Sequence, residues 1–125
     1  MLTPEEAMER SKAWISAWND HDLERILAHY AEEIEFISPF AVRLAGVPDG
    51  TVRGKAALRE YFRKALEAYP ELHFHLHFVC ASVQSFTVVY ESVHGLQAVE
   101  VFELNEAGEV CRVLAHYGTR ELEKA

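Results

Sequence analysis

The sequence contains few cysteines, few basic residues and no long hydrophobic run. Cys80 and Cys111 are the only cysteines among 125 residues, and both fall in strand-like segments, so we expect two reduced, buried thiols. No stretch approaches the roughly 20 apolar residues that a membrane helix needs. The first residues contain acids and no apolar core of signal-peptide length. These absences predict a cytoplasmic protein.

The charge balance excludes further classes of partner. Lysine and arginine total 12 against 20 aspartates and glutamates, which gives a formal net charge of -8 at pH 7. An acidic surface repels phosphate backbones and anionic membranes, so we expect neither nucleic acid nor membrane as a partner. The sequence also lacks a dinucleotide-binding glycine motif, a P-loop and a serine nucleophile elbow. We therefore expect no cofactor.

The N-terminal half has helical patterns. Thr3-Pro4-Glu5-Glu6 combines a capping box with a proline at the first helical position. Amphipathic patterns predict three helices, over residues 3–18, 22–32 and 55–69. They are interrupted by a short strand over 34–38 and by a glycine-containing loop over 40–53. A loop of this length either closes one end of a cavity or packs over a sheet edge.

The C-terminal half has the alternation of strands. Four strands are predicted over residues 72–83, 86–94, 96–105 and 110–119, joined by hairpin turns. Helices followed by a strand meander, in a chain that is 50% apolar, indicate a single α+β domain over residues 1–125. We expect three helices packed on one curved antiparallel sheet.

Several local patterns occur in a characteristic order: NDHDLERILAHYAEE, SPF, GTVRGKAALREYF and VEVFELNEAGEV. In these patterns the chain resembles the NTF2-like superfamily, which includes ketosteroid isomerases and SnoaL-like polyketide cyclases. The resemblance covers nearly the whole chain. It implies a cone-shaped α+β fold with an apolar cavity, and a homodimer formed through the outer sheet face at Thr87, Val89, Val101, Leu114 and His116.

Glu100 is the strongest candidate for chemistry. It interrupts an apolar row on one face of its predicted strand, formed with Leu96, Ala98, Phe102 and Leu104. If this row faces a cavity, burial raises the pKa of Glu100 and makes it a general acid, a general base or a hydrogen-bond donor. If the opposite face is buried instead, Glu100 is solvated or salt-bridged.

The resemblance to ketosteroid isomerase fails at two positions. The aspartate base of that enzyme corresponds to Ser38, and its oxyanion-hole tyrosine corresponds to Trp14. Only its protonated acid has a similar counterpart here, Glu100. A serine hydroxyl is too weak a base to abstract a carbon-bound proton unaided. This pattern argues against steroid isomerisation by that mechanism.

Two tyrosines share predicted inward rows with apolar residues, and both are candidates to donate a hydrogen bond to Glu100. We predict Glu100, Tyr90 and Tyr117 as catalytic residues, although a structural hydrogen bond in the core is the alternative. The predicted ligand pocket consists of Trp14, Trp18, Ser38, Tyr61, Phe86, Val88, Phe102 and Val113. Aromatic rows on helices are also common in ordinary cores.

Three histidines alternate along one predicted strand. Imidazoles at His73, His75 and His77 would project the same way, as in a metal site that takes Glu91 or His116 as a third ligand. However, Leu72, Phe74, Leu76 and Phe78 form the apolar row of that strand. The histidines are therefore expected to face solvent or a dimer partner, where they would confer pH sensitivity. We expect no metal site.

Together these features predict a small-molecule pocket protein of the SnoaL-like kind. Its ligand would be a compact apolar molecule with one polar group directed at Glu100 and a tyrosine. As an enzyme, it would be a cofactor-free isomerase, cyclase, dehydratase or hydrolase. The alternative is a non-catalytic ligand-binding or dimerisation module.

Overall fold

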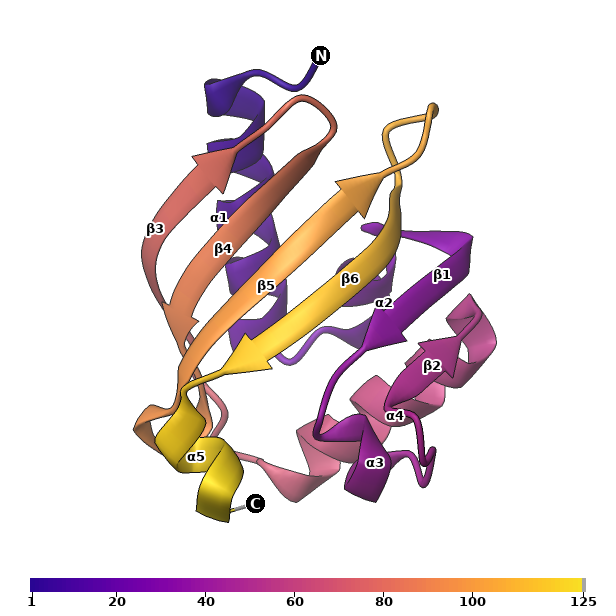
Figure 1. Cartoon of the computed structure of the whole chain (residues 1–125), viewed down its shortest axis with the longest axis vertical. Coiled ribbons are helices and arrows are strands. Elements are labelled where there is room, and N and C mark those ends of the chain that lie inside the picture. The colour runs from indigo at the N-terminus through magenta and orange to yellow at the C-terminus, as the bar shows by residue number, and fades with distance from the viewer. Residues whose placement is uncertain (125) are drawn as a thin grey trace.

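The computed structural model describes residues 1–124 and has the expected α+β architecture. Figure 1 shows a twisted sheet with α1, α2 and α4 behind it and with α3 and α5 at one end. The elements are α1 (Pro4–Asn19), α2 (Leu23–Leu27), β1 (Tyr30–Ile37), α3 (Ala41–Leu44), β2 (Thr51–Arg53), α4 (Lys55–Ala68), β3 (His75–Ala81), β4 (Ser85–Glu91), the 3-10 turn η1 (Val93–Gly95), β5 (Gln97–Leu104), β6 (Val110–Tyr117) and α5 (Thr119–Lys124).

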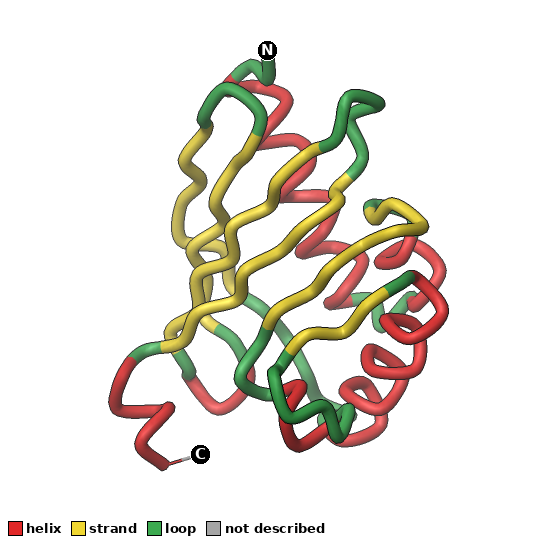
Figure 2. Tube along the Cα trace, turned by 45° about the vertical axis from the view of Figure 1, so that its right-hand side comes forward, coloured by secondary structure: helices red, strands yellow, loops and turns green. Residues whose placement is uncertain are grey.

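The sheet is mixed, not wholly antiparallel. Its strand order is β2-β1-β6-β5-β4-β3, and β1 runs parallel to β6 whereas the other neighbours are antiparallel. Figure 2 shows the strands side by side with the long helices α1 and α4 on one side of them. The prediction of an antiparallel sheet is wrong at this pair because alternation reveals which residues share a face but not the direction of a strand.

The second helix is shorter than predicted. α2 ends at Leu27, and the segment expected to complete it begins β1 instead. Tyr30 pairs with Val110 on β6, and the N–H of Val110 donates to the carbonyl of His29 over 3.2 Å. Tyr30 is buried in β1, and the predicted helix would have buried it too. Its apolar character therefore did not distinguish a helix from a strand.

The loop over residues 40–53 also contains regular structure, namely α3 and the three-residue edge strand β2. Gly50 approaches this region closely: a Cβ atom there would lie 3.0 Å from the carbonyl oxygen of Ser38, and its φ of +72° favours glycine. By contrast, α1 and α4 lie close to their predicted ranges. Thr3 Oγ1 accepts a hydrogen bond from the N–H of Glu6 at 3.1 Å, as the capping box predicts.

A β-bulge in β3 corrects the predicted orientation of one aromatic side chain. The register with β4 shifts between Leu76 and Phe78, so Val79 and not Phe78 lies opposite the buried Val88. Phe78 is consequently 55% exposed. The prediction that Phe78 belongs to the core is wrong because the extra residue reverses the alternation beyond it.

The core lies between the helices and the inner face of the sheet. Trp14 from α1 packs edge-on against Tyr90 and Phe102, each at 5.3 Å between ring centroids, and stacks on Phe74 at 5.8 Å. Trp18, one turn further along α1, packs edge-on against Phe62 of α4 at 4.9 Å. These aromatic contacts join α1 to α4 and to the inner face of the sheet.

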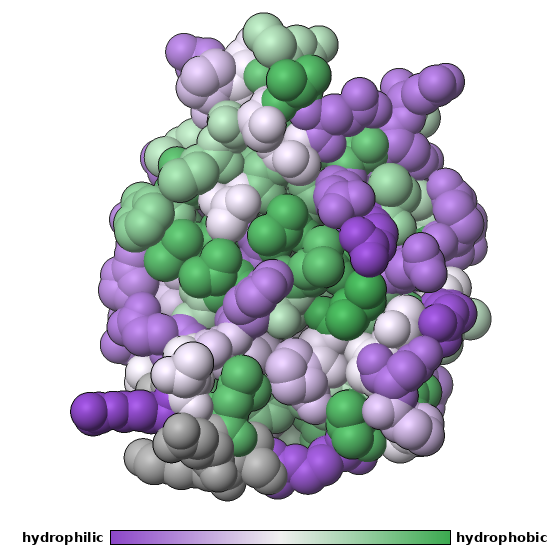
Figure 3. Space-filling model, viewed as in Figure 1, coloured by the Kyte–Doolittle hydropathy of each residue, from purple (hydrophilic) through white to green (hydrophobic). Residues whose placement is uncertain are grey.

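The outer face of the sheet has no helix over it in the described residues. Half-buried apolar side chains of its central strands meet there, and we call them the outer apolar patch: Val89, Val99, Val101 and Leu114. Figure 3 shows hydrophobic side chains gathered over these strands. Within residues 1–124, no helix is both long and apolar enough to cross a lipid bilayer.

Candidate functional site

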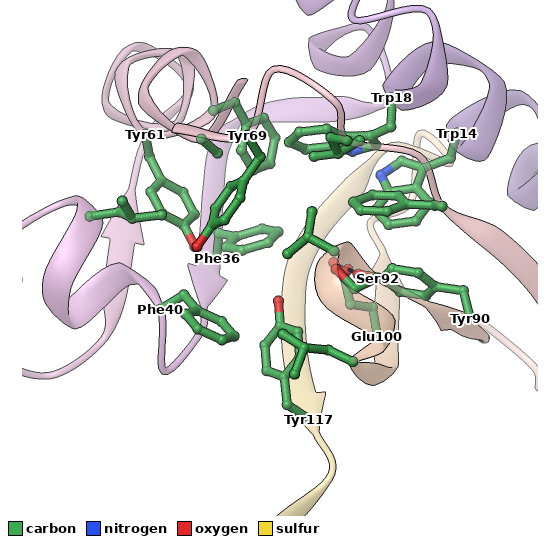
Figure 4. Close-up of a pocket in the computed structure, with 17 residues that line it drawn as sticks. Trp14, Trp18, Phe36, Phe40, Tyr61, Tyr69, Tyr90, Ser92, Glu100 and Tyr117 are labelled. Atoms are coloured by element: carbon green, nitrogen blue, oxygen red, sulfur yellow. Dashed lines mark hydrogen bonds between the residues drawn. The ribbon is translucent and has the colours of Figure 1, made fainter. Parts of the chain in front are cut away.

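A cavity lies between the inner face of the sheet, α1 and α4 (Figure 4). The volume of this cavity is about 70 Å³, counted as the space open to the centre of a water molecule. One water needs roughly 10–15 Å³ by this measure, so the cavity has room for several waters or a compact organic molecule. Its lining is mostly aromatic and aliphatic, with polar groups from Glu100, Ser92 and four tyrosines, Tyr61, Tyr69, Tyr90 and Tyr117.

Glu100 lies in the wall of this cavity and is 3% exposed. It faces inward because β5 buries Ala98, Glu100 and Phe102, the row expected from the sequence. Its cross-strand neighbours are the apolar Val88 on β4 and Ala115 on β6. Burial raises the pKa of Glu100 to about 7, although a hydrogen bond from Tyr90 partly opposes the rise.

Tyr90 is the one hydrogen-bond partner that Glu100 has in the described residues. Its hydroxyl donates to Oε2 of Glu100, whereas Oε1 is buried without a partner there. Tyr90 lies two residues beyond Val88 on the neighbouring strand, so both side chains project inward. Burial, followed by the nearby charge of Glu100, raises the pKa of Tyr90 well above its ordinary value and keeps the phenol protonated as a donor.

Two further tyrosines bring hydroxyl groups to the cavity from other elements. Tyr117 of β6 packs edge-on against Phe40 at 4.6 Å, and burial and the charge of Glu100 raise its pKa. Burial raises the pKa of Tyr61 on α4 to about 12. The nearby Ser38 hydroxyl lowers the pKa of both tyrosines in part, which places Ser38 beside the two phenols.

The two tryptophans of α1 differ in their polar contacts. Trp14 Nε1 donates to the hydroxyl of Tyr30 at 2.8 Å. Trp18 Nε1 has no acceptor among the described residues, although Trp18 is only 5% exposed. Both rings line the cavity, so one wall carries an occupied indole N–H and a free one.

The structure thus brings six predicted residues together at one cavity: Glu100, Tyr90, Tyr117, Trp14, Trp18 and Tyr61. The other five predicted pocket residues are buried but lie outside its lining: Ser38, Phe86, Val88, Phe102 and Val113. Phe86 stacks on Phe102 at 4.9 Å, and Phe102 in turn packs on Trp14. The inward rows extend further along the strands than the cavity does. The sequence does not show where the cavity ends and the close-packed core begins.

Sequence reasoning missed wall residues in connecting segments. Phe40 and Leu44, from the loop predicted to close a cavity or cover an edge, line one end of it. Residues between α4 and β3 and between β4 and β5 complete the wall, including Tyr69, Leu72 and Ser92. One signal for these wall residues was available in the sequence. Apolar residues occur beside Pro70 and Gly95, where a solvent-exposed turn would favour polar ones.

The strand histidines do not line this cavity. His73, His75 and His77 are all exposed, and the rings of His73 and His75 lie 4.8 Å apart. Among the side chains that the structure describes, no group of three histidine, cysteine or acidic residues is arranged to hold a metal ion. A role for these histidines at a dimer interface stays a prediction.

Comparison with known proteins agrees with this geometry. The model of the SnoaL-like domain family matches residues 11–120. A SnoaL-like protein of unknown function from Burkholderia thailandensis is 42% identical, over 93% of this chain and 97% of its own, with a TM-score of 0.89. No curated protein matches the sequence.

Two more distant structures share the fold. SalBIII, an epoxide hydrolase/cyclase-like enzyme of pyran ring formation in salinomycin, is 20% identical over 96% of each chain, with a TM-score of 0.76. TerC, co-crystallised with polyporic acid, is 18% identical over 94% of this chain and 95% of its own, with a TM-score of 0.73. The family match and the relative from Burkholderia thailandensis confirm the SnoaL-like resemblance seen in the sequence: this chain has the NTF2-like fold and belongs to the SnoaL-like domain family.

Proposed function

We propose that this protein is a cofactor-free acid–base enzyme that acts on a compact, largely apolar molecule in the cavity beside Glu100. The observation that carries the proposal is the free Oε1 of a buried carboxyl group with a pKa of about 7. Near neutral pH such a group is present in both its acid and its base form, which suits proton transfer in either direction.

The surroundings of Glu100 support this role. Tyr90 fixes one carboxyl oxygen and leaves the other for a substrate. The aromatic walls provide apolar contact area, while Tyr117 and Ser92 supply hydroxyl groups at the same cavity. The fold is also used by an epoxide hydrolase/cyclase-like enzyme and by TerC, which was co-crystallised with polyporic acid; this is an analogy of fold alone.

Hydrogen–deuterium exchange of 2-tetralone tests the proposal directly. This bicyclic ketone has acidic protons beside its carbonyl, and ¹H NMR in D2O follows their loss. The protein is expected to accelerate exchange, and Glu100→Gln to reduce the accelerated rate by about 100-fold or more, because an amide cannot accept the proton. The wild-type rate is expected to rise with pH through a midpoint near 7, the pKa of Glu100.

The matched control is Glu103→Gln, which alters an acid of the same strand that is ion-paired with Arg112. It is expected to leave the exchange rate within about two-fold, since Glu103 is not part of the cavity wall. Equal exchange rates in wild type and Glu100→Gln would refute the assignment of Glu100.

A second candidate function is non-catalytic ligand binding. It is favoured by Ser38, which stands before Pro39 where ketosteroid isomerase has its base. Among the described residues that line the cavity, Glu100 therefore has the one carboxyl group. A binding module would take up 2-tetralone without accelerating its exchange. Its affinity would change only modestly in Glu100→Gln.

A further inference from the structure

Two buried polar side-chain atoms have no hydrogen-bond partner among the side chains that the structure describes: Oε1 of Glu100 and Nε1 of Trp18. They come from different elements, β5 and α1, yet both side chains line the same cavity. Buried polar groups in folded proteins are almost always hydrogen-bonded, so each exception calls for a physical reason. Two exceptions at one cavity have a common reason if a ligand satisfies both.

The neighbouring tryptophan shows that this exception is not forced by the helix. Trp14, one turn earlier on the same side of α1, has an acceptor in the hydroxyl of Tyr30. Around Trp18 the neighbours are aromatic hydrocarbon rings, Phe62 at 4.9 Å and Phe74 at 5.5 Å between centroids. The protein thus provides an indole N–H with no oxygen for it to bond.

The chemistry of the two groups defines what would bind. An indole N–H only donates, so its partner is an acceptor such as a carbonyl or ether oxygen. A carboxyl group with a pKa near 7 either donates or accepts, so it suits a hydroxyl group. In Figure 4 Trp18 lies across the cavity from Tyr117, with Glu100 and Ser92 to one side.

We infer that Trp18 is a ligand-binding residue whose indole N–H donates to an acceptor oxygen of a ligand that also places a hydroxyl group at Glu100. The ligand class is therefore a compact, largely apolar molecule with two separate oxygen functions, an acceptor such as a carbonyl and a hydroxyl group. The inference rests on the proposed function of the cavity and adds the second polar group. It also assigns this donor role to Trp18 instead of Trp14, whose N–H is already occupied.

Three bicyclic probes test the two contacts separately. 6-Hydroxy-1-tetralone has both oxygens, 6-hydroxytetralin lacks the carbonyl, and 1-tetralone lacks the hydroxyl. The chain has only two tryptophans, so a ¹H–¹⁵N spectrum shows two indole signals. Both ketones are expected to shift the Trp18 indole proton downfield, and 6-hydroxytetralin is expected to leave it in place.

Replacement of Trp18 by 3-benzothienylalanine exchanges the N–H for sulfur with little change of shape. This variant is expected to bind 6-hydroxy-1-tetralone about five- to ten-fold more weakly, the effect of one neutral hydrogen bond. Its affinity for 6-hydroxytetralin is expected to stay within about two-fold. The same replacement at Trp14 is the control. There the affinities for the two probes are expected to change by the same factor.

The outcomes separate this inference from the proposed function. In one outcome the ketones bind and Glu100→Gln lowers the affinity for the hydroxylated probes, but neither the Trp18 signal nor the affinity of the benzothienyl variant depends on the carbonyl. This outcome would overturn the inference and leave the Glu100 site in place. An N–H directed at the face of Phe62 would give that result. If none of the three probes binds at millimolar concentration, both the inference and the proposed ligand cavity are overturned.

Discussion

The hydroxyl of Tyr90 donates a hydrogen bond to Oε2 of Glu100, and both side chains are buried on the inner face of the sheet. The pair joins neighbouring strands, β4 and β5, in an otherwise apolar row. A buried carboxyl group without a cation beside it favours its neutral form, and the phenol offsets only part of that preference. The stability of the fold is thereby coupled to the proton that the site would use.

The first prediction concerns stability against pH. The pKa of Glu100 is about 7 in the folded state, against 4.5 for a glutamate in water. Between these values the folded protein keeps a proton that the unfolded chain has lost, so rising pH favours unfolding. At 1.36 kcal/mol per pH unit, Glu100 alone lowers the free energy of unfolding by ~3 kcal/mol from below pH 4.5 to above pH 7.

Urea unfolding of wild type and Glu100→Gln at pH 5 and pH 8 measures this effect. The variant is expected to gain stability relative to wild type as the pH rises, because glutamine has no proton to lose and still accepts from Tyr90. Glu106→Gln, in the exposed turn between β5 and β6, serves as the control and should show no such trend. A difference between wild type and Glu100→Gln that is constant with pH would contradict the raised pKa.

The second prediction isolates the hydrogen bond. In Tyr90→Phe the pKa of Glu100 is expected to rise above about 7, since the Tyr90 hydroxyl holds it down in the wild type. Titration of the ¹³C-labelled carboxyl group by NMR measures the change, with Glu100→Gln to assign the signal. Tyr117→Phe keeps the Tyr90 bond and is expected to shift this pKa less. A fall of the Glu100 pKa in Tyr90→Phe would show that the phenol does not stabilise the carboxylate.

Much of this arrangement could be predicted from the sequence. The inward row of β5 identified Glu100 because a single acid in a row of alternating apolar residues indicates a carboxyl group on the buried face. This holds for either direction of the strand. The capping box predicted the start of α1, and Pro70 predicted the end of α4. The family patterns supplied what periodicity lacks, the packing of helices onto one face of a single sheet.

Other features depend on contacts that no local pattern encodes. The start of β1 at Tyr30 is set by pairing with β6, some 80 residues away. The outward Phe78 is set by a one-residue bulge, which leaves composition unchanged while it reverses the face. Likewise, Phe86 and Glu100 face the same side of the sheet, and only packing decides that one lies in solid core and the other at a cavity.

The third prediction tests the buried bond between Trp14 and Tyr30. Tyr30→Phe removes one oxygen and leaves the Trp14 N–H buried without an acceptor, so it is expected to cost about 1–2 kcal/mol of unfolding free energy. Tyr69→Phe, at a half-buried cavity residue, is the control and is expected to stay within about 0.5 kcal/mol. Urea unfolding compares the two variants. Equal losses would mean that the Trp14–Tyr30 bond contributes no net stability.

The last prediction concerns the outer apolar patch. We propose that two copies of the chain pair through it, since a contiguous apolar patch on a sheet face that no helix covers marks an interaction site. Val101 lies at its centre, opposite Thr87 on β4 and Leu114 on β6. A glutamate at this position would bury two like charges close together in a symmetric dimer, whereas in a monomer the carboxylate would reach water.

Light scattering after size exclusion measures the outcome. Wild type is expected at twice 14.2 kDa and Val101→Glu at 14.2 kDa. Ala13→Glu introduces the same charge at an exposed position of α1 and is expected to remain a dimer, because α1 lies on the opposite side of the sheet. A monomeric wild type would remove the proposed interface. A dimeric Val101→Glu would place the interface elsewhere, and the edge strand β3, where Phe78 is exposed, would become the next surface to test.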